Sequence, residues 1–568
     1  MADERATLPQ PGSAGRAWRF AGLALVLAVA AALRLIGITW GLPDGTHLFS
    51  YHPDEFHSLR GALSMAFGDL NPHFFNYGSL YLYLVGAAAA LAHGEIFASI
   101  SQAVPGGPVL PEAIRAWTLD ARIVTVILGV ATVAVVYALG REIWNHRAGL
   151  AAALLLALAP LHVLHSHYAT VDVPGAFLAA LALLLAVRMM RAMTLRNAAW
   201  AGVACGLAAS VKYSGAFVLV APLAAWLLAF RDSRATPEER PPIGALVLPP
   251  VAALAAFALT SPYTFLDWPN ALQDICFEMQ HMGAGDDPWM MAAWPNGWLF
   301  HLNGLALGTG FIMLAASAVG LASGLAVGRR ELLVLLAFGL VAFAVIGNAE
   351  VRYARYEMPL LPVLAVLAGG LVSNDLFAMV RGRLPAWGMA AAITALLAGS
   401  AWGAAVLDQR MLRELVLPDA RDLALQAIER DVPPDGTVGL ISEPWFYQPP
   451  VDYCNGGAVL RGNLTWREYR RPVRALLVLG LDPDRLLVER PDAMVVSGWE
   501  IDGPLRGDDL EARAFMDALA QMGYEVSSFG GAMSDWSQRS RPPATDWLYP
   551  FVRVELWRAP DGPLRAEQ

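Results

Sequence analysis

"YGSLYLYLVGAAAALAHG", residues 77 to 94, is the stretch that decides how this chain is arranged. Its apolar part approaches the roughly 20 residues that a helix needs to cross a membrane. Its three tyrosines, at positions 77, 81 and 83, are instead typical of a helix that lies in the membrane interface. The choice between these interpretations sets the side of the membrane on which every later loop is expected.

The composition of the whole chain places this stretch in a membrane protein. Of the 568 residues, 56% are hydrophobic and only 16% are charged, which is too apolar for an ordinary soluble protein. The chain is therefore expected to cross the membrane several times. After a first apolar run at 18–40, further runs of spanning length lie at about 119–139, 148–165, 173–187, 197–211, 214–230, 243–260, 301–325, 331–347, 358–373 and 385–406.

The distribution of arginine favours the interfacial interpretation of residues 77 to 94. If that stretch spanned the membrane, several arginine clusters would lie outside; if it lies in the interface, every cluster falls on the cytoplasmic side, as the positive-inside rule requires. The clusters lie at 141–147, 188–196, 231–240, 329–330 and 381–383. Arg16 and Arg19 likewise place the N-terminal tail, residues 1–17, in the cytoplasm.

The predicted fold is an all-α polytopic membrane bundle of about eleven transmembrane helices with additional interfacial helices. The bundle occupies residues 18–406 and includes a large first outer loop, residues 41–118. From 407 to 568 the apolar runs shorten to strand length, which predicts an outward-facing soluble α/β domain. Its strands are predicted at 437–442, 492–498, 524–530 and 551–557, and its helices at 418–431 and 508–522.

The loop "SYHPDEFHSLRGAL", residues 50 to 63, contains the first candidate catalytic residues, Asp54 and Glu55. A carboxylate at the membrane boundary can deprotonate an acceptor hydroxyl, and an adjacent acid can support it. The same residues also suit a plain helix start, with Pro53 at the first helical position and acids in the first turn. The sequence leaves both interpretations open.

Asp172 and Lys212 are expected on the same outer side. Asp172 lies in a short turn between two apolar runs, where an ionisable group is costly unless it has a partner or lines an aqueous cavity. Its alternative role is to cap the helix that begins near Val173. Lys212 is the only lysine in the chain, and its compact ammonium suits a phosphate, although an interfacial anchor would carry the same charge.

Arg352 and Arg355, in "EVRYARYEMP", are further candidates for binding a phosphate. The planar guanidinium fork matches the geometry of phosphate oxygens and can bind two of them at once. Ion pairing with nearby acidic residues is the alternative for either arginine.

A last group of residues is a candidate for contact with an acceptor or a sugar. It comprises His52, His57, Tyr168, Trp289 and Trp294. The tryptophans lie in "DDPWMMAAWPNGW", where they can stack on a sugar, form a mobile lid or sit at the headgroup level. The histidines match no zinc spacing. A divalent cation, Mg²⁺ or Mn²⁺, shared by Asp54, Asp172 and a lipid phosphate stays open.

Taken in order, several segments resemble the GT-C glycosyltransferases that use polyprenyl-phosphate sugars. These segments are "YHPDEFHSLRGAL" after the first span, the interfacial "GSLYLYLVGA", then "LHVLHSHYATVDVP", "VKYSG" and "RYARYEMPLLPVLA". The nearest group is the protein O-mannosyltransferase and aminoarabinose-transferase-like superfamily, with a glycosyltransferase family 39-like pattern. The resemblance covers roughly residues 18 to 375.

The resemblance implies an inverting glycosyltransferase on the outer face of the membrane, whose donor is a sugar linked to a polyprenyl phosphate. Asp54 matches the acid of the family's first loop and would be the general base, while Asp172 matches the second-loop acid. Lys212 matches the basic residue that binds the lipid phosphate, with Arg352 or Arg355 assisting. Glu55 follows a position where the family often has an acid. The acceptor, whether glycan, lipid or protein, is not named.

Two other classes of protein compete with this one. A polytopic transporter or lipid flippase typically has charges near the membrane midplane and internal repeats, whereas here the charges are predicted at one face and no repeat is visible. A non-catalytic envelope scaffold would tolerate the loss of Asp54. Nucleic acid is not an expected partner, because the net charge is -9.

The cellular location follows from the composition and the predicted topology. The chain is rich in alanine and has one lysine among its 40 basic residues, which suggests a bacterial source. We therefore expect a multi-pass protein of the inner (cytoplasmic) membrane, with its active site facing the periplasm.

Overall fold

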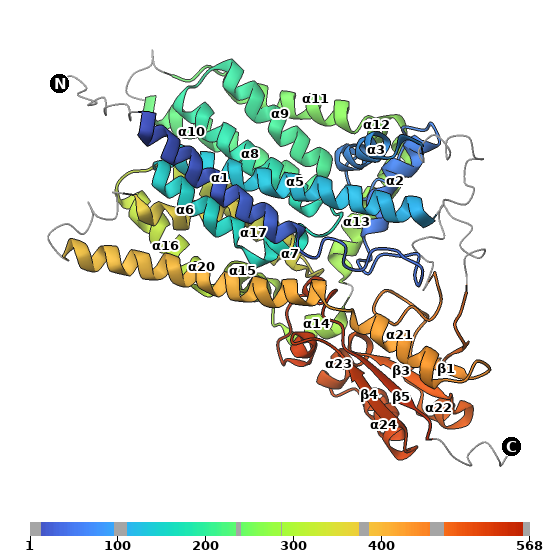
Figure 1. Ribbon diagram of the computed structural model, residues 1–568. Coiled ribbons are helices and arrows are strands. Elements are labelled where there is room, and N and C mark those ends of the chain that lie inside the picture. The colour runs from blue at the N-terminus through green and yellow to red at the C-terminus, as the bar shows by residue number, and fades with distance from the viewer. Residues whose placement is uncertain are drawn as a thin grey trace.

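The computed structural model describes residues 13–95, 111–233, 240–285, 287–373, 385–454 and 471–560. It is mostly helical, and its long helices lie side by side in a bundle with the strands gathered at one end (Figure 1). The main helices of the bundle are α1 (Ser13–Leu35), α3 (Leu80–Ala92), α5 (Pro111–Ile143), α6 (His146–Ala157), α7 (Pro160–His165), α8 (Asp172–Arg191), α9 (Leu195–Val211), α10 (Val220–Asp232), α11 (Gly244–Thr260), α15 (Gly297–Thr309), α16 (Phe311–Ala326), α17 (Glu331–Gly347), α18 (Leu361–Gly369) and α20 (Ala386–Val416).

Shorter elements connect these helices at the end that carries the strands. They are α2 (Glu55–Ala66), α12 (Tyr263–Leu266), α13 (Trp268–Ala284) and α14 (Pro288–Ala293). Three 3-10 segments, η1 (Tyr213–Leu219), η4 (Ala354–Leu360) and η5 (Gly370–Val372), adjoin α10 and α18 directly. These segments continue their neighbours, so that Tyr213–Asp232 and Ala354–Val372 each form one apolar stretch.

Several helices have the length and composition of membrane spans. Within the described part of the chain, five helices are long and apolar enough to cross a membrane, and a sixth span arises if α15 and α16, which meet at 101°, count as one. Five further apolar helices have between 10 and 17 residues. A multi-pass membrane protein is therefore supported, whereas the total of about eleven spans stays a prediction.

The run at 148–165 and the stretch 77–94 do not form single spanning helices. The run at 148–165 is broken between α6 and α7, because Pro160 begins α7 and Ala159 before it is extended (φ -69°, ψ 113°). The decisive stretch 77–94 forms α3, whose 13 residues fall short of the roughly 20 needed to cross. Tyr81 of α3 donates a hydrogen bond to Ala121 O of α5 (3.1 Å), so α3 packs on the bundle, and its interfacial position stays a prediction.

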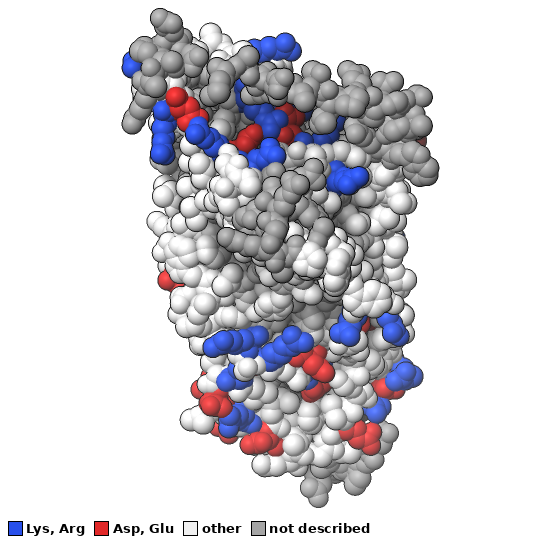
Figure 2. All heavy atoms as spheres, turned by 90° about the vertical axis from the view of Figure 1, so that its left-hand side faces the viewer, with Lys and Arg blue, Asp and Glu red and all other residues white. Residues whose placement is uncertain are grey.

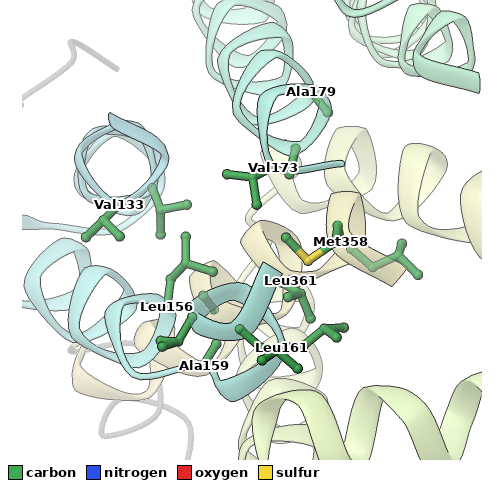
Figure 3. Packing of buried hydrophobic residues seen from close by; sticks show 14 of the residues in the cluster. Val133, Leu156, Ala159, Leu161, Val173, Ala179, Met358 and Leu361 are labelled. Atoms are coloured by element: carbon green, nitrogen blue, oxygen red, sulfur yellow. The ribbon is translucent and has the colours of Figure 1, made fainter. Parts of the chain in front are cut away.

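The core of the bundle lies where α5, α6, α7, α8 and η4 meet. Figure 3 shows Val133, Leu156, Leu161, Val173 and Met358 pointing toward one another from these five elements. Helices α5 and α6 approach closely at Gly149, where an added Cβ would lie 2.6 Å from Tyr137 O. Small residues therefore let these two backbones pack without side chains between them.

The surface of the bundle is apolar over a wide area. In Figure 2 the acidic and basic side chains gather toward the top and bottom of the face shown, and a band between them carries almost none. Large apolar side chains such as Leu259 and Trp402 are exposed on α11 and α20. Exposed apolar surface of this extent needs an apolar surrounding such as lipid.

The C-terminal region contains a five-stranded mixed sheet in the order β2-β1-β3-β5-β4. The strands are β1 (Thr437–Leu440), β2 (Ala475–Val478), β3 (Ala493–Ser497), β4 (Glu525–Phe529) and β5 (Val554–Arg558), and the helices are α21 (Ala420–Asp431), α22 (Pro483–Glu489), α23 (Gly498–Arg506) and α24 (Leu510–Gln521). The first three strands are parallel, and β5 is antiparallel to both of its neighbours. Successive residues of β3 face opposite apolar clusters, with Val495 on the side of α21 and Met494 on the side of α24.

The four strands and two helices predicted in this region are all present, and β2, α22 and α23 are additional. Helix α20 continues unbroken through Leu407 to Val416, so the predicted domain boundary at 407 falls within a helix. The N-terminal tail predicted at 1–17 lies largely outside the described residues.

Candidate active site

Asp54 stands at the start of α2 and pairs with an arginine from a distant part of the chain. It occupies the N-cap position of α2, but its side chain makes no capping hydrogen bond. Asp54 Oδ2 lies 3.0 Å from Arg355 Nη1 instead, and a quarter of the Asp54 side chain (24%) stays exposed. Pro53 precedes the N-cap, so its predicted place at the first helical position is wrong. The geometry disfavours a helix-capping role for Asp54.

A second acid and base pair lies beside the first. Lys212, at the end of α9, donates a hydrogen bond from Nζ to Asp172 Oδ1 (2.8 Å), and Asp172 is the first residue of α8. The Asp172 side chain is buried and makes no capping bond, whereas that of Lys212 is partly exposed. Such a pair satisfies the requirement that an ionisable group at the end of a buried helix has a partner.

Tyr356 connects the two pairs. The Lys212 ammonium lies 4.7 Å from the centre of the Tyr356 ring, and the Arg355 guanidinium lies 6.0 Å from it. Arg355 also lies 3.9 Å from the ring centre of Tyr353. Both cations are therefore held over aromatic faces in addition to their carboxylates. The result is a single cluster of two acids, two bases and two tyrosines.

The charges of this cluster act on the protonation of Asp54. Burial raises the pKa of Asp54, and the nearby charge of Asp172 acts in the same direction. The positive charge of Arg355, with smaller contributions from His52 and His57, outweighs both effects, so the pKa of Asp54 lies below its ordinary value. Asp54 is therefore a carboxylate at neutral pH. Only one carboxylate oxygen of Asp54, Oδ2, faces Arg355, and the side chain is partly exposed, so the carboxylate keeps the capacity to accept a proton.

Glu55, the neighbour of Asp54, has a different environment. Its side chain is fully buried, and Arg122 of α5 donates two hydrogen bonds to it, from Nε to Oε1 and from Nη2 to Oε2, each 2.7 Å long. Glu55 also accepts from Ala169 N (2.7 Å) and from Ser50. Arg122 donates further to Ile38 O and Trp40 O. Glu55 thus ties the loop to the bundle.

Arg352 does not join the cluster of Asp54. Its Nη1 donates to Trp294 O (3.1 Å), and its Nη2 lies 3.6 Å from Glu350 Oε2. Trp294 Nε1 donates to Pro542 O (3.1 Å), and Trp289 packs against Gly503 of α23. The two tryptophans therefore join the bundle to the C-terminal region, Arg352 holds the loop of Trp294, and Arg355 is the arginine that faces Asp54.

The remaining predicted residues, His52, His57 and Tyr168, line the buried side of the loop. The ring of His52 packs against Tyr168 (4.4 Å) and against Tyr549 (4.6 Å), and His57 stacks on Phe74 (5.0 Å). Burial lowers the pKa of His52 to about 4 and lowers the pKa of His57 as well. Both rings are therefore neutral at pH 7, and Arg355 is the main positive charge beside Asp54 at that pH.

The structure also brings in residues that the sequence did not single out. They are Arg122, Tyr356, Asp546 and Tyr549. Arg122 lies inside an apolar run, where a lone arginine signals a buried partner and could have been noticed. Asp546 and Tyr549 lie in "RPPATDWLYP", an ordinary loop composition that carries no such signal.

A divalent cation held by Asp54, Asp172 and a lipid phosphate stays a prediction. Among the described residues, no group of three or more His, Cys, Asp or Glu is placed to hold a metal ion. Each acid already faces a cationic side chain, Arg355 or Lys212, which a metal would have to displace. No step below depends on a metal ion.

The structure thus combines an apolar multi-pass bundle with a cluster of two acids and two basic residues at one end. Residues 116–264 match the family model described as dolichyl-phosphate-mannose-protein mannosyltransferase. This part of the chain contains both Asp172 and Lys212. A search of curated protein sequences finds no match.

Solved structures show the same fold. ArnT from Cupriavidus metallidurans in the apo state is 16% identical, with 85% of this chain and 93% of that chain covered and a TM-score of 0.52. The same protein bound to undecaprenyl phosphate is 16% identical, with coverage of 95% and 98% and a TM-score of 0.50. The predicted resemblance to the GT-C glycosyltransferases is confirmed by the family model and by this fold.

Proposed function

We propose that this protein is an inverting glycosyltransferase that moves a sugar from a polyprenyl-phosphate donor to an acceptor hydroxyl. The observation that carries the proposal is the cluster in which Asp54 pairs with Arg355 and Asp172 with Lys212, side by side around Tyr356. Transfer from a lipid phosphate needs a base for the incoming hydroxyl and cations for the departing phosphate. The cluster contains both.

In the proposed reaction the donor phosphate separates the two ion pairs. Its oxygens attract Lys212 and Arg355, which loosens their hold on Asp172 and Asp54. Asp54 then takes the proton of the acceptor hydroxyl, and the acceptor oxygen attacks the anomeric carbon of the sugar. The bond from that carbon to the phosphate oxygen breaks, and its electron pair stays on the phosphate. A single displacement of this kind inverts the anomeric configuration.

The other predicted residues receive supporting roles in this proposal. Asp172 orients the acceptor or the base after Lys212 turns to the phosphate. Glu55 keeps the loop in place through Arg122, because all of its hydrogen bonds are directed to the protein. Arg352 assists through the loop that it anchors at Trp294. His52, which accepts a hydrogen bond from Asp54 N, packs with Tyr168 to form an aromatic wall of the loop.

The reaction is proposed to take place at the outer face of the membrane. Helix α8 has 20 residues, about 30 Å, with Asp172 at its first position and Arg191 at its last. Arg191 pairs with Glu142 and Glu331 at the opposite end of the bundle from the cluster. The positive-inside rule assigns the end of Arg191 to the cytoplasm and the cluster to the periplasm. The inner membrane, eleven spans and an outward C-terminal domain belong to the same proposal.

The partners follow from this chemistry. The donor is a sugar on a polyprenyl phosphate that lies in the surrounding membrane lipids, and the acceptor is a hydroxyl of a glycan, a lipid or a protein. ArnT of Cupriavidus metallidurans, whose fold is similar, has been solved with undecaprenyl phosphate bound. Undecaprenyl phosphate is therefore the first lipid to test.

The proposal is tested with purified protein in nanodiscs and a panel of radiolabelled undecaprenyl-phosphate sugars. We expect turnover of one donor by the wild type and a loss of about 10²- to 10⁴-fold in Asp54→Asn, because the base is removed while the shape of the side chain is kept. Asp69→Asn, which alters an exposed acid after α2, serves as the control and retains activity.

Either of two results would contradict the proposal. One is the absence of turnover with every donor in the wild type when native membrane extract supplies the acceptor. The other is an Asp54→Asn variant as active as the wild type. Both would favour the transporter, flippase or scaffold alternatives.

A further inference from the structure

Asp546 of the C-terminal region reaches into the bundle beside the cluster. It belongs to η9 (Thr545–Trp547), which contacts η4, and its side chain is fully buried. Asp546 Oδ1 accepts a hydrogen bond from Ala354 N (3.0 Å), and Oδ2 accepts one from Arg355 N (2.8 Å). These bonds join residues that are more than 190 positions apart in the chain.

The two bonds fix the backbone that carries Arg355. Ala354 and Arg355 are the first residues of η4, where no preceding turn supplies partners for the backbone N–H groups. With both N–H groups held by one carboxylate, the direction in which the Arg355 side chain leaves the backbone is set. A further contact comes from Arg355 Nη1, which donates to Tyr549 Oη (3.4 Å).

The segment around Asp546 is itself anchored on both sides. Before it, Pro542 O accepts from Trp294 Nε1 (3.1 Å) of the bundle. After it, the Trp547 side chain is fully buried, and the Tyr549 ring stacks on Trp499 (5.7 Å) of α23. His165 Nε2 lies 3.7 Å from Asp546 Oδ2. The carboxylate is thus held in a rigid frame that spans both parts of the molecule.

We infer that Asp546 is a positioning residue through which the C-terminal region sets the phosphate-binding geometry of Arg355. The inference rests on the proposed function, because it assigns Arg355 to the donor phosphate. It adds that the C-terminal region is part of the donor site and not only a neighbour of it. Asp546 itself does not touch the donor; it acts through the backbone of residues 354 and 355.

Variants of Asp546 are expected to act in a graded way. Asp546→Asn keeps one carbonyl oxygen and so accepts one of the two backbone bonds, whereas Asp546→Ala accepts neither. A displacement of Arg355 by a fraction of a hydrogen-bond length is enough to weaken a charge-assisted contact with phosphate. The loss of donor binding in Asp546→Ala is therefore expected to approach the loss in Arg355→Gln. The loss in Asp546→Asn should lie between that of Asp546→Ala and the wild-type value.

A matched control separates positioning from general destabilisation. Asp419 is another buried carboxylate that joins the C-terminal region to the bundle, with Arg421 and Trp40 as its partners. It makes no contact with Arg355 in the described residues. Asp419→Ala is expected to lower the melting temperature about as much as Asp546→Ala and to leave donor binding unchanged.

The experiment measures binding of undecaprenyl phosphate to the full-length protein in nanodiscs, together with KM and kcat for the donor identified above. We expect Asp546→Ala to weaken binding about 10- to 100-fold and to raise KM in proportion. Asp546→Asn should show a smaller change in the same direction, and Asp419→Ala none. If Asp546→Ala fails to fold, the asparagine variant decides by the same criterion.

The outcomes that overturn the inference differ from those that overturn the proposed function. Unchanged binding and KM in the Asp546 variants, or an equal loss in Asp419→Ala, would refute the positioning role while Asp54→Asn remains inactive. Full transfer by Asp54→Asn would refute the proposed function whatever the Asp546 variants do to lipid binding.

Discussion

Asp54 and Glu55 are adjacent in the sequence, yet they belong to two different environments. Glu55 is buried against α5 with a bidentate arginine and further donors, so its capacity to accept hydrogen bonds is taken up by the protein. Asp54 has one arginine, no capping bond and a side chain that is partly exposed. The comparison teaches that an acid available for chemistry is one whose carboxylate oxygens are partly exposed and have few hydrogen-bond partners, whether the residue is Asp or Glu.

The sharpest test of this comparison is the loss of Glu55. Glu55→Ala leaves the Arg122 charge buried without its partner, which is expected to cost about 3–5 kcal/mol of stability, measured as a lowered melting temperature in detergent. Asp54→Asn should lower the melting temperature by much less, because its amide oxygen can still accept a hydrogen bond from Arg355 and the side chain is partly exposed.

The double variant Glu55→Leu with Arg122→Met serves as the control for Glu55→Ala. It removes both charges and should recover most of the loss, since a buried ion pair can be replaced by apolar residues at little cost. A stable Glu55→Ala protein that is catalytically inactive would instead give Glu55 a direct role in the reaction.

The second test uses the pH dependence of turnover in Arg355→Gln. Arg355 holds the pKa of Asp54 below its ordinary value against burial, which acts in the opposite direction. Without Arg355 the effect of burial prevails and the pKa of Asp54 rises, so the acidic limb of the kcat profile moves to higher pH. The variant should also lose about 10²- to 10³-fold in rate as a phosphate ligand disappears.

Arg352→Gln is the matched control for this shift. Its guanidinium is bonded to Trp294 O and lies near Glu350, so its loss should leave the acidic limb where it is in the wild type. An unmoved limb in Arg355→Gln, measured with the same donor, would mean that Asp54 is not the group whose protonation limits turnover.

The smallest expected effect concerns Tyr356, whose ring lies between the cations of the two ion pairs. Tyr356→Leu removes the aromatic face beside Lys212 and Arg355, a contribution of about 0.5–2 kcal/mol. The KM for the donor should rise roughly twofold to thirtyfold with little change in melting temperature. Tyr356→Phe keeps the ring and should behave like the wild type; a large defect in that variant would assign the function to the hydroxyl group.

Much of the local structure could be predicted from the sequence. The short apolar runs of the C-terminal region predicted four of the five strands, because they have the length of a strand and not that of a membrane span. The strand β2, "ALLV", was missed because a short apolar run has no period that distinguishes strand from helix. Likewise, the apolar runs predicted a membrane bundle, and their lengths did not reveal the break at Pro160.

The candidate site residues could also be predicted, but the contacts between them could not. Asp54, Asp172, Lys212 and Arg355 could be selected because charged groups beside apolar runs need a reason to be there. Which acid faces which base depends on contacts between helices far apart in the chain. Asp54 meets Arg355 across about 300 positions, and Asp546 reaches Arg355 from the C-terminal loop.

The sequence by itself determined that this protein lies in a membrane, where its helices and strands approximately fall, and which few ionisable residues lie near the membrane boundary. Composition and periodicity are local properties, and they are sufficient for these conclusions. Only the tertiary structure decided that Glu55 is satisfied by Arg122 while Asp54 stays partly exposed, and that the C-terminal region fixes Arg355. Burial and hydrogen-bond satisfaction depend on neighbours that the chain brings together only when it folds.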